Sequence, residues 1–179
     1  MRSQFVRLCA VALLAGAFCA FAEEKKAEET KEVPKTYSRE FERLKTLVGK
    51  WTGKVDMGKG PVDMTAEYRV IAAGSVVEER VFPGTPQEMV SMYYDKDGKL
   101  AMTHYCMLGN RPQMKLKASD DKSITMDFDE CCGIDAKKEC HMHGMKIVFD
   151  DADTITTSCV GLKDGKEMPS CANTLKRAK

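Results

Sequence analysis

Hydrophobic residues follow two different periods along the chain, and the first of them is helical. In residues 41–48 the large apolar side chains recur at intervals of three and four, which places them on one face of a helix. Gly49 follows directly, and glycine is common where helices end. The pattern therefore predicts one short amphipathic helix that leads into the rest of the domain.

From residue 51 onward the period is two, which is typical of strands with one buried face. The clearest case is 62–70, where Val, Met, Ala, Tyr and Val alternate with Asp, Thr, Glu and Arg. Shorter runs with the same alternation cover 114–117, 124–129 and 145–149. Because successive side chains of a strand point to opposite faces, each run predicts a strand with an apolar inner face.

Turn signals separate about nine or ten such strands, and no long helices alternate with them. Two of the turns are Asp-Gly pairs, at 97–98 and 164–165, which suit tight hairpins. An antiparallel sheet of this size protects its edge strands by closing on itself. The sequence therefore predicts an all-β domain over residues 38–177, in which one short helix precedes a single antiparallel up-and-down β-barrel. The interior of such a barrel holds side chains or one small ligand.

The first 22 residues have the features of a cleavable export signal. Arg2 and Arg7 make a basic start, residues 8–21 are almost wholly apolar, and Ala-Phe-Ala ends the segment with a small-x-small cleavage pattern. The apolar run is shorter than the roughly 20 residues that a membrane span needs. We expect cleavage after Ala22 and a secreted or periplasmic mature protein.

The segment after the signal, residues 23–37, is rich in Glu and Lys, so we expect a charged, flexible tether. Loss of the signal removes two arginines and no acid, which lowers the formal net charge of the chain from +1 to −1. A nearly neutral chain is not typical of proteins that bind nucleic acid or anionic membranes. We expect neither as a partner of the mature protein.

Six of the eight cysteines remain after cleavage, and an even number in an exported chain favours disulfides. Cys159 and Cys171 lie at equal distances on either side of Gly165. In an antiparallel hairpin with its turn at that glycine, the two cysteines face each other across neighbouring strands. We predict a cross-strand disulfide between them, provided that the strand register is not shifted by one residue.

A second pairing is less defined. Cys140 lies shortly after the neighbouring Cys131 and Cys132, so a disulfide to either one would close the polar loop between them. The same thiols together with His141 would alternatively suit a soft metal ion. Cys106 and the remaining cysteine are left without an argument for pairing.

All three histidines lie in two short motifs that also contain cysteine and methionine. The motifs are Met-Thr-His-Tyr-Cys-Met at 102–107 and Cys-His-Met-His at 140–143. Imidazole, thiol and thioether groups bind soft metals, haem or electrophiles. By strand parity His104 and Cys106 share a face, which we expect to be the inner one. The alternative is a buried histidine with one hydrogen bond beside an inert thiol.

The stretch Leu-Val-Gly-Lys-Trp-Thr-Gly at 47–53 resembles the Gly-x-Trp start of calycin-type barrels, which include lipocalins, fatty-acid-binding proteins and nitrobindin-like proteins. In those families the tryptophan closes one end of the barrel, and a basic residue on the last strand packs across it. The resemblance implies these roles for Trp51 and Arg177. A guanidinium over an indole is a favourable cation–π contact.

The chain also resembles an uncharacterised family of secreted bacterial lipocalin-like domains over most of residues 44–177. That family brings no established activity. The chain departs from it at Cys159, where members often have tryptophan, and Cys131, Cys132 and Cys171 are peculiar to this chain. The matching stretches are Phe-Pro-Gly-Thr-Pro at 82–86, Glu-Met-Val at 88–90, Thr-His-Tyr-Cys at 103–106, Gly-Asn-Arg-Pro-Gln-Met at 109–114, His-Met-His at 141–143 and Asp-Gly-Lys at 164–166.

These observations favour a non-catalytic, exported calycin-like barrel that binds a small apolar or amphipathic molecule, without a cofactor. Apolar walls would supply affinity through burial, and a few polar groups would set the orientation of the ligand. The predicted ligand-binding residues come from both motifs and from the inner faces of the strands: Met102, His104, Cys106, Met114, Met126, Phe128, His141 and His143.

Two alternatives belong to other classes of protein. In the first, His104, His141 and His143 bind a transition metal or haem, because three protein ligands with an open position are typical of a site that accepts a further ligand. In the second, the chain is an enzyme that uses Cys106 as its nucleophile with His104 as the base. No oxyanion-hole or phosphate-binding motif accompanies that pair, so we expect no catalysis.

Overall fold

The computed structural model describes residues 35–179 except 57 and 59, and a single short helix, α1 (Arg39–Lys45), precedes its strands. Ser38 caps the helix because its side-chain oxygen accepts a hydrogen bond from the backbone N–H of Phe41. Phe41 and Leu44 are fully buried, so the helical face expected at 41–48 is the one that packs inward. The predicted signal at 1–22 and most of the tether at 23–37 lie outside the described residues.

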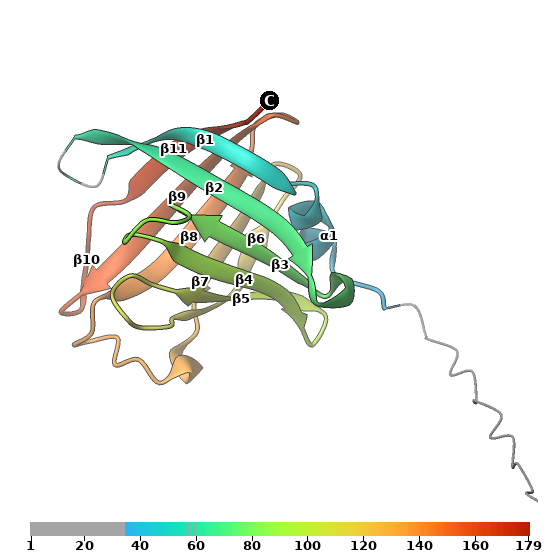
Figure 1. Cartoon of the computed structure of the whole chain (residues 1–179). Helices are drawn as coiled ribbons and strands as arrows, with labels where there is room; N and C mark the ends of the chain where they lie inside the picture. The colour runs from blue at the N-terminus through green and yellow to red at the C-terminus, as the bar shows by residue number, and fades with distance from the viewer. Residues whose placement is uncertain (1–34, 57, 59) are drawn as a thin grey trace, which may run out of the picture. The chain divides into compact units, whose positions relative to one another are not determined.

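The strands that follow form one antiparallel sheet that closes into a barrel (Figure 1). From β1 to β10 each strand pairs with the next along the chain, and β11 returns to pair with both β9 and β1. The all-β, up-and-down barrel predicted from the sequence is therefore confirmed. The strands are β1 (Gly49–Asp56), β2 (Pro61–Ile71), β3 (Val76–Val81), β4 (Met89–Lys96), β5 (Lys99–Tyr105), β6 (Gln113–Ser119), β7 (Ser123–Phe128), β8 (His141–Phe149), β9 (Thr154–Lys163), β10 (Lys166–Glu167) and β11 (Cys171–Arg177), with 3₁₀ turns at Ala72–Gly74 and Glu130–Cys132.

Trp51 and Arg177 lie opposite each other in the β1–β11 pair that closes the barrel. The guanidinium carbon of Arg177 is 4.3 Å from the centre of the Trp51 ring, which is the contact that the resemblance implied. The indole N–H donates to the carbonyl of Leu47 at 2.7 Å, and the guanidinium donates to the carbonyls of Thr46 and Val48. These bonds attach the segment after α1 to the closing strands.

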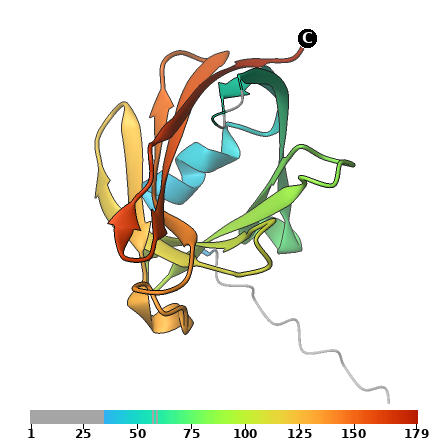
Figure 2. The same cartoon turned by 90° about the vertical axis from the view of Figure 1, so that its left-hand side faces the viewer.

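Helix α1 lies across one end of the barrel (Figure 2). The apolar side chains of the helix join the inner faces of the strands in one buried cluster. The fully buried members with the largest side chains are Trp51, Tyr68, Tyr93, Phe41, Leu44, Leu47, Leu100, Met102, Met114, Ile124, Met126 and Ile147.

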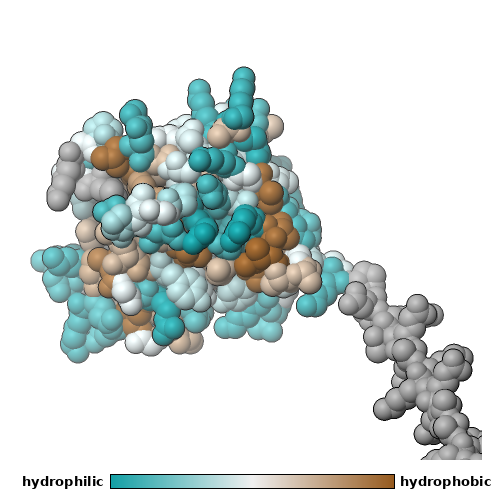
Figure 3. All heavy atoms as spheres, in the orientation of Figure 1, coloured by the Kyte–Doolittle hydropathy of each residue, from teal (hydrophilic) through white to brown (hydrophobic). Residues whose placement is uncertain are grey.

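The face of the molecule seen in Figure 3 is mostly hydrophilic, with apolar residues in scattered patches. In β2 the predicted alternation holds for Met64, Ala66 and Tyr68, which are buried. Val62 and Val70 belong to the same alternation but are more than a third exposed, because they lie near the two ends of this long strand. Among the described residues, no helix is long and apolar enough to cross a membrane.

Candidate functional site

The barrel interior is hollow at the end away from α1. Strand β1 leaves the helix at Gly49 and reaches a cavity of about 130 Å³ at Val55. The cavity lies among eight strands and is lined by Val55, Met64, Glu79, Val81, Phe82, Met89, Ser91, His104, Met142, Met145, Thr157, Ser158, Cys159, Cys171 and Asn173.

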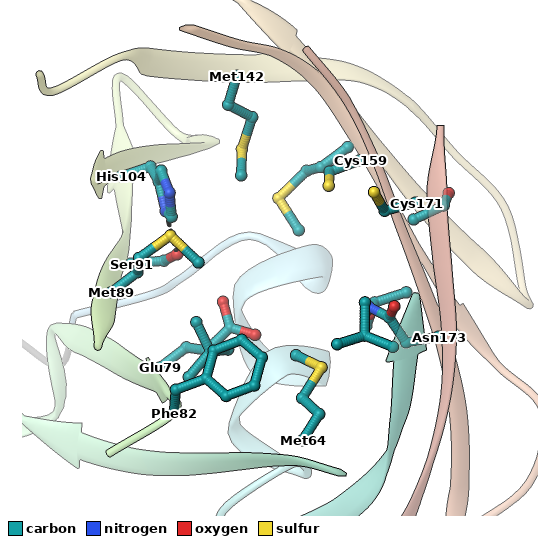
Figure 4. Close-up of a pocket in the computed structure, with 15 residues that line it drawn as sticks. Met64, Glu79, Phe82, Met89, Ser91, His104, Met142, Cys159, Cys171 and Asn173 are labelled. Carbon is teal, nitrogen blue, oxygen red and sulfur yellow. Dashed lines mark hydrogen bonds between the residues drawn. The ribbon is translucent and has the colours of Figure 1, made fainter. Parts of the chain in front are cut away.

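Sulfur-containing side chains make up much of this lining. Met64, Met89 and Met142 extend into the space, and Cys159 and Cys171 lie on one wall (Figure 4). Unbranched thioether side chains are flexible and polarizable, so they adjust to the outline of an apolar molecule. The walls therefore suit a ligand of variable shape and low polarity.

His104 is the polar residue of the β5 wall, and it is only 3% exposed. Its Nδ1 lies 3.0 Å from the hydroxyl oxygen of Ser91 on β4, which faces it across the strand pair. Its Nε2 is buried and has no hydrogen-bond partner among the described side chains or backbone. Burial lowers the pKa of His104 to about 4, so the ring is neutral at pH 7.

Glu79 brings a carboxylate to the cavity from the inner face of β3, where it is 7% exposed. Its two oxygens accept hydrogen bonds from the hydroxyl groups of Tyr68, at 2.6 Å, and Tyr93, at 2.8 Å. Burial, and then the charge of Glu79, raise the pKa of both tyrosines well above the ordinary value. Both phenols therefore stay protonated and remain donors to Glu79.

Asn173 lies on the opposite wall, on β11 (Figure 4). Its Nδ2 donates to the hydroxyl of Thr157 on β9 at 3.2 Å, and its Oδ1 is buried without a partner among the described groups. More than nine in ten buried polar groups of proteins are paired. The unpaired oxygen of Asn173 and the unpaired nitrogen of His104 therefore set these two lining residues apart from ordinary buried polar side chains.

Cys159 and Cys171 are directly opposite each other in the β9–β11 pair, as their spacing about Gly165 predicts. Burial, and then the neighbouring Cys171, raise the pKa of Cys159 to about 11, so its thiol is protonated and a poor nucleophile at pH 7. All six cysteines of the described residues are free thiols in this structure, Cys131, Cys132 and Cys140 included. The predicted disulfides are therefore not present in it.

Of the eight residues predicted to bind the ligand, His104 lines the cavity. Met102, Met114, Met126 and Phe128 do point inward but are packed into the core beside it, where none is more than 4% exposed. The strand period identifies these four as inner-face residues, but it does not show which part of the inner face is filled by the core. Cys106 follows the end of β5 and is half-buried, and burial raises the pKa of its thiol.

His141 and His143 do not line the cavity, because β8 contains a bulge. Met142 is opposite Gly161 and Gly144 is opposite Val160, so His143 is an extra residue in the pairing. The bulge changes the parity of the strand and turns Met142 into the cavity instead. His141 Nε2 lies 3.1 Å from His143 Nδ1, and both rings pack on Phe128.

The three imidazoles predicted as metal ligands are therefore not brought to one point. His104 bonds to Ser91 inside the barrel, whereas Nδ1 of His141 lies 2.7 Å from the carbonyl oxygen of Glu139. Within the part of the chain that the structure describes, no group of three or more His, Cys, Asp or Glu side chains is placed to hold a metal ion.

Glu79 and Asn173 line the cavity but are not among the residues predicted from the sequence. For Glu79 the sequence does contain an indication. In Val-Val-Glu-Glu-Arg-Val at 76–81, Glu79 falls between Val77 and Val81 at a spacing of two. An acid at an inner position of an apolar strand face is unusual enough to mark a site. Asn173 has no comparable signal, because apolar and polar residues do not alternate clearly in Cys-Ala-Asn-Thr-Leu at 171–175.

The closed antiparallel barrel fits a calycin-like fold, and comparison with known proteins finds a solved structure of similar fold. No protein-family model matches the chain, and no curated protein matches it in sequence. A solved structure of a protein of unknown function, from the DUF3598 family of Nostoc punctiforme PCC 73102, is similar with a TM-score of 0.53 at 13% identity, over 75% of this chain and 49% of that one. The chain thus spans about half the length of this neighbour.

Two designed proteins are similar at lower scores. The redesigned β-barrel mFAP1 bound to DFHBI matches with a TM-score of 0.37 at 10% identity, over 75% of this chain and 97% of that one. EF1p2_mFAP2b bound to DFHBI matches with a TM-score of 0.36 at 11% identity, over 75% and 95%.

Proposed function

We propose that this protein is an exported, non-catalytic β-barrel that binds one small, mostly apolar molecule in the cavity at the end away from α1. The observation that carries the proposal is a cavity of about 130 Å³ with mostly apolar walls, whose lining includes a few polar side chains. Two of them, His104 and Asn173, each have one buried polar atom without a partner among the described groups. A few fixed polar groups on an apolar surface are typical of small-molecule sites.

The size of the cavity limits the ligand. Its 130 Å³ is close to the roughly 150 Å³ of an engineered apolar cavity that binds benzene. A ligand of about six to ten non-hydrogen atoms follows, unless the methionines move. Ligands of that size gain at most about 1.5 kcal/mol per non-hydrogen atom, and usually much less. We expect dissociation constants in the micromolar to millimolar range.

Export is a proposal that rests on the N-terminal segment, and it has a consequence for the cavity wall. In an oxidising compartment the opposed thiols of Cys159 and Cys171 would form a disulfide that joins β9 to β11. N-terminal sequencing of the exported protein should then begin at Glu23. Alkylation with and without reductant should show these two cysteines protected, and alkylation of both without reductant would count against the disulfide.

Toluene binding, measured by the ligand-induced rise in melting temperature and by NMR titration, tests the proposed function. The variant Cys171→Phe fills the cavity wall, and Ala172→Phe adds the same ring on the exposed outer side of the same strand. We expect wild type and Ala172→Phe to bind toluene, and Cys171→Phe to lose binding at least tenfold. Absence of binding to wild type, or equal binding to both variants, would contradict the proposal.

A further inference from the structure

We propose that the cavity selects a small organic cation, an ammonium group on an apolar body, and that Glu79 binds the ammonium. The inference rests on the proposed function, since it names the class of ligand for the same cavity. The observation behind it is a buried acid that faces the ligand space without a basic side chain to balance it.

The two neighbouring acids of β3 show what is unusual about Glu79. Glu78 points outward, is 6% exposed, and pairs with two guanidinium groups: Arg69 at 2.7 Å and Arg80 at 3.4 Å. Glu79 points inward, is similarly buried, and has only the hydroxyl groups of two tyrosines. The outer acid therefore has its counter-charge within the protein, and the inner acid does not.

The hydrogen bonds of Glu79 leave part of its carboxyl group free for a ligand. Each of its two oxygens accepts a phenol hydrogen bond, and a carboxylate is an acceptor only, with room for about four such bonds. Two acceptor positions of the carboxylate therefore remain for a ligand.

None of the described residues that line the cavity is a lysine or an arginine. The other titratable groups in the lining are His104, Cys159 and Cys171, and none of them supplies a positive charge: the imidazole is neutral at pH 7, and thiols carry no positive charge in either form. A buried charge without a partner is costly, and an opposite charge brought by a ligand offsets that cost. Anionic ligands are disfavoured for the same reason.

A protonated primary amine fits the remaining geometry. It has three donors and no acceptor, and two residues of the cavity lining have acceptor capacity left: the carboxyl group of Glu79, and Asn173, whose Oδ1 has no partner. Figure 4 shows the Glu79 carboxylate pointing into the space and Asn173 on the wall across from it. The methionine and phenylalanine side chains between them would contact the apolar body of the amine.

The test compares benzylamine with benzyl alcohol at pH 7 by isothermal titration calorimetry. The two probes have nearly the same shape, but only the amine is charged. We expect wild type to bind benzylamine at least tenfold more tightly than benzyl alcohol. Glu79→Gln should abolish that preference. Glu130→Gln should keep it, because it removes the same charge from an exposed position outside the cavity.

Each outcome separates this inference from the proposed function. Toluene binding without a preference for the amine, or a preference that persists in Glu79→Gln, would overturn the inference and leave the apolar cavity function intact. Failure of toluene, benzylamine and benzyl alcohol alike would overturn the proposed function as well. If Glu79→Gln does not fold, the ratio of the two affinities in wild type decides alone. Asn173→Leu should then weaken benzylamine more than benzyl alcohol.

Discussion

The two ends of the barrel interior are built from the same strands but from different kinds of residue. Along the inner face of β9 the sequence passes from Ile155 through Thr157 to Cys159, and along β11 it passes from Leu175 through Asn173 to Cys171. In both strands the large aliphatic residue lies toward the helix end and the small or polar residues lie at the cavity. A single strand thus contributes to stability at one end and to a binding site at the other.

Hydrogen bonding differs between the two ends in the same way. At the helix end the Trp51 indole N–H donates to a backbone carbonyl, so the buried polar atom is paired within the protein. At the cavity end His104 and Asn173 each keep one buried atom without a partner. Buried polar groups left unpaired lower stability, so we expect the cavity end to be maintained for binding and the helix end for folding.

Truncation at the helix end should have the largest effect. Trp51→Ala removes a fully buried ring, its hydrogen bond to Leu47 and the surface on which Arg177 packs. We expect a loss of about 3–5 kcal/mol in the free energy of unfolding, measured by denaturant titration. Met142→Ala at the cavity should cost less, about 1.5 kcal/mol or below, because Met142 is only partly buried and loses fewer packing contacts. Equal losses would contradict the contrast between the two ends.

The helix end could be predicted from the sequence because its signals are local or paired by simple spacing. The helical period at 41–48, the alternation in the strands and the contact of Trp51 with Arg177 all appear as expected. Strand parity also placed His104 on the inner face, and symmetry about Gly165 placed Cys159 opposite Cys171. These features depend on the period of a strand and on one hairpin register.

The cavity end could be predicted only in part, because its lining depends on a β-bulge and on the packing of the core, and the strand period shows neither. One extra residue at His143 changes the parity of β8 and replaces two histidines by Met142 in the lining. Parity also separates inner from outer residues without telling core from cavity, and the predicted ligand-binding residues Met102 and Met114 belong to the core. Glu79 was visible in the alternation but becomes a site residue only when β3 is placed in the barrel.

Acid should weaken the cavity end through His104. Its pKa is about 4 in the folded protein, below the ordinary 6.5, so the unfolded chain binds a proton more readily. The stability from the neutral ring is complete above pH 6.5 and is lost as pH falls from there to about 4, by roughly 3 kcal/mol. His104→Gln should show a flatter dependence between these pH values in thermal unfolding. Parallel curves for the two proteins would exclude this role.

Arg177 tests the closing contact with a smaller effect. Arg177→Met keeps an apolar stem over the indole but removes the guanidinium and its bonds to Thr46 and Val48. We expect a loss of about 1–2 kcal/mol, since cation–π contacts contribute about 0.5–2 kcal/mol and the bonds add to them. Lys176→Met, next to it and exposed, should change stability by less than about 0.5 kcal/mol. A similar loss in both would assign the effect to the strand and not to the contact.

The smallest effect is expected where polar atoms of the cavity wall are replaced together. The double variant Asn173→Leu with Thr157→Val removes the hydrogen bond between them and the free Oδ1 while keeping both shapes. Replacing both partners by apolar groups of similar shape is close to neutral, so unfolding should change by at most about 1 kcal/mol, and in the stabilising direction. Thr157→Val alone leaves Nδ2 of Asn173 without an acceptor and should cost about 1–3 kcal/mol. A double variant less stable than this single one would show that the pair supports the fold as the helix end does. In that case the division of the interior into a folding end and a binding end would not hold.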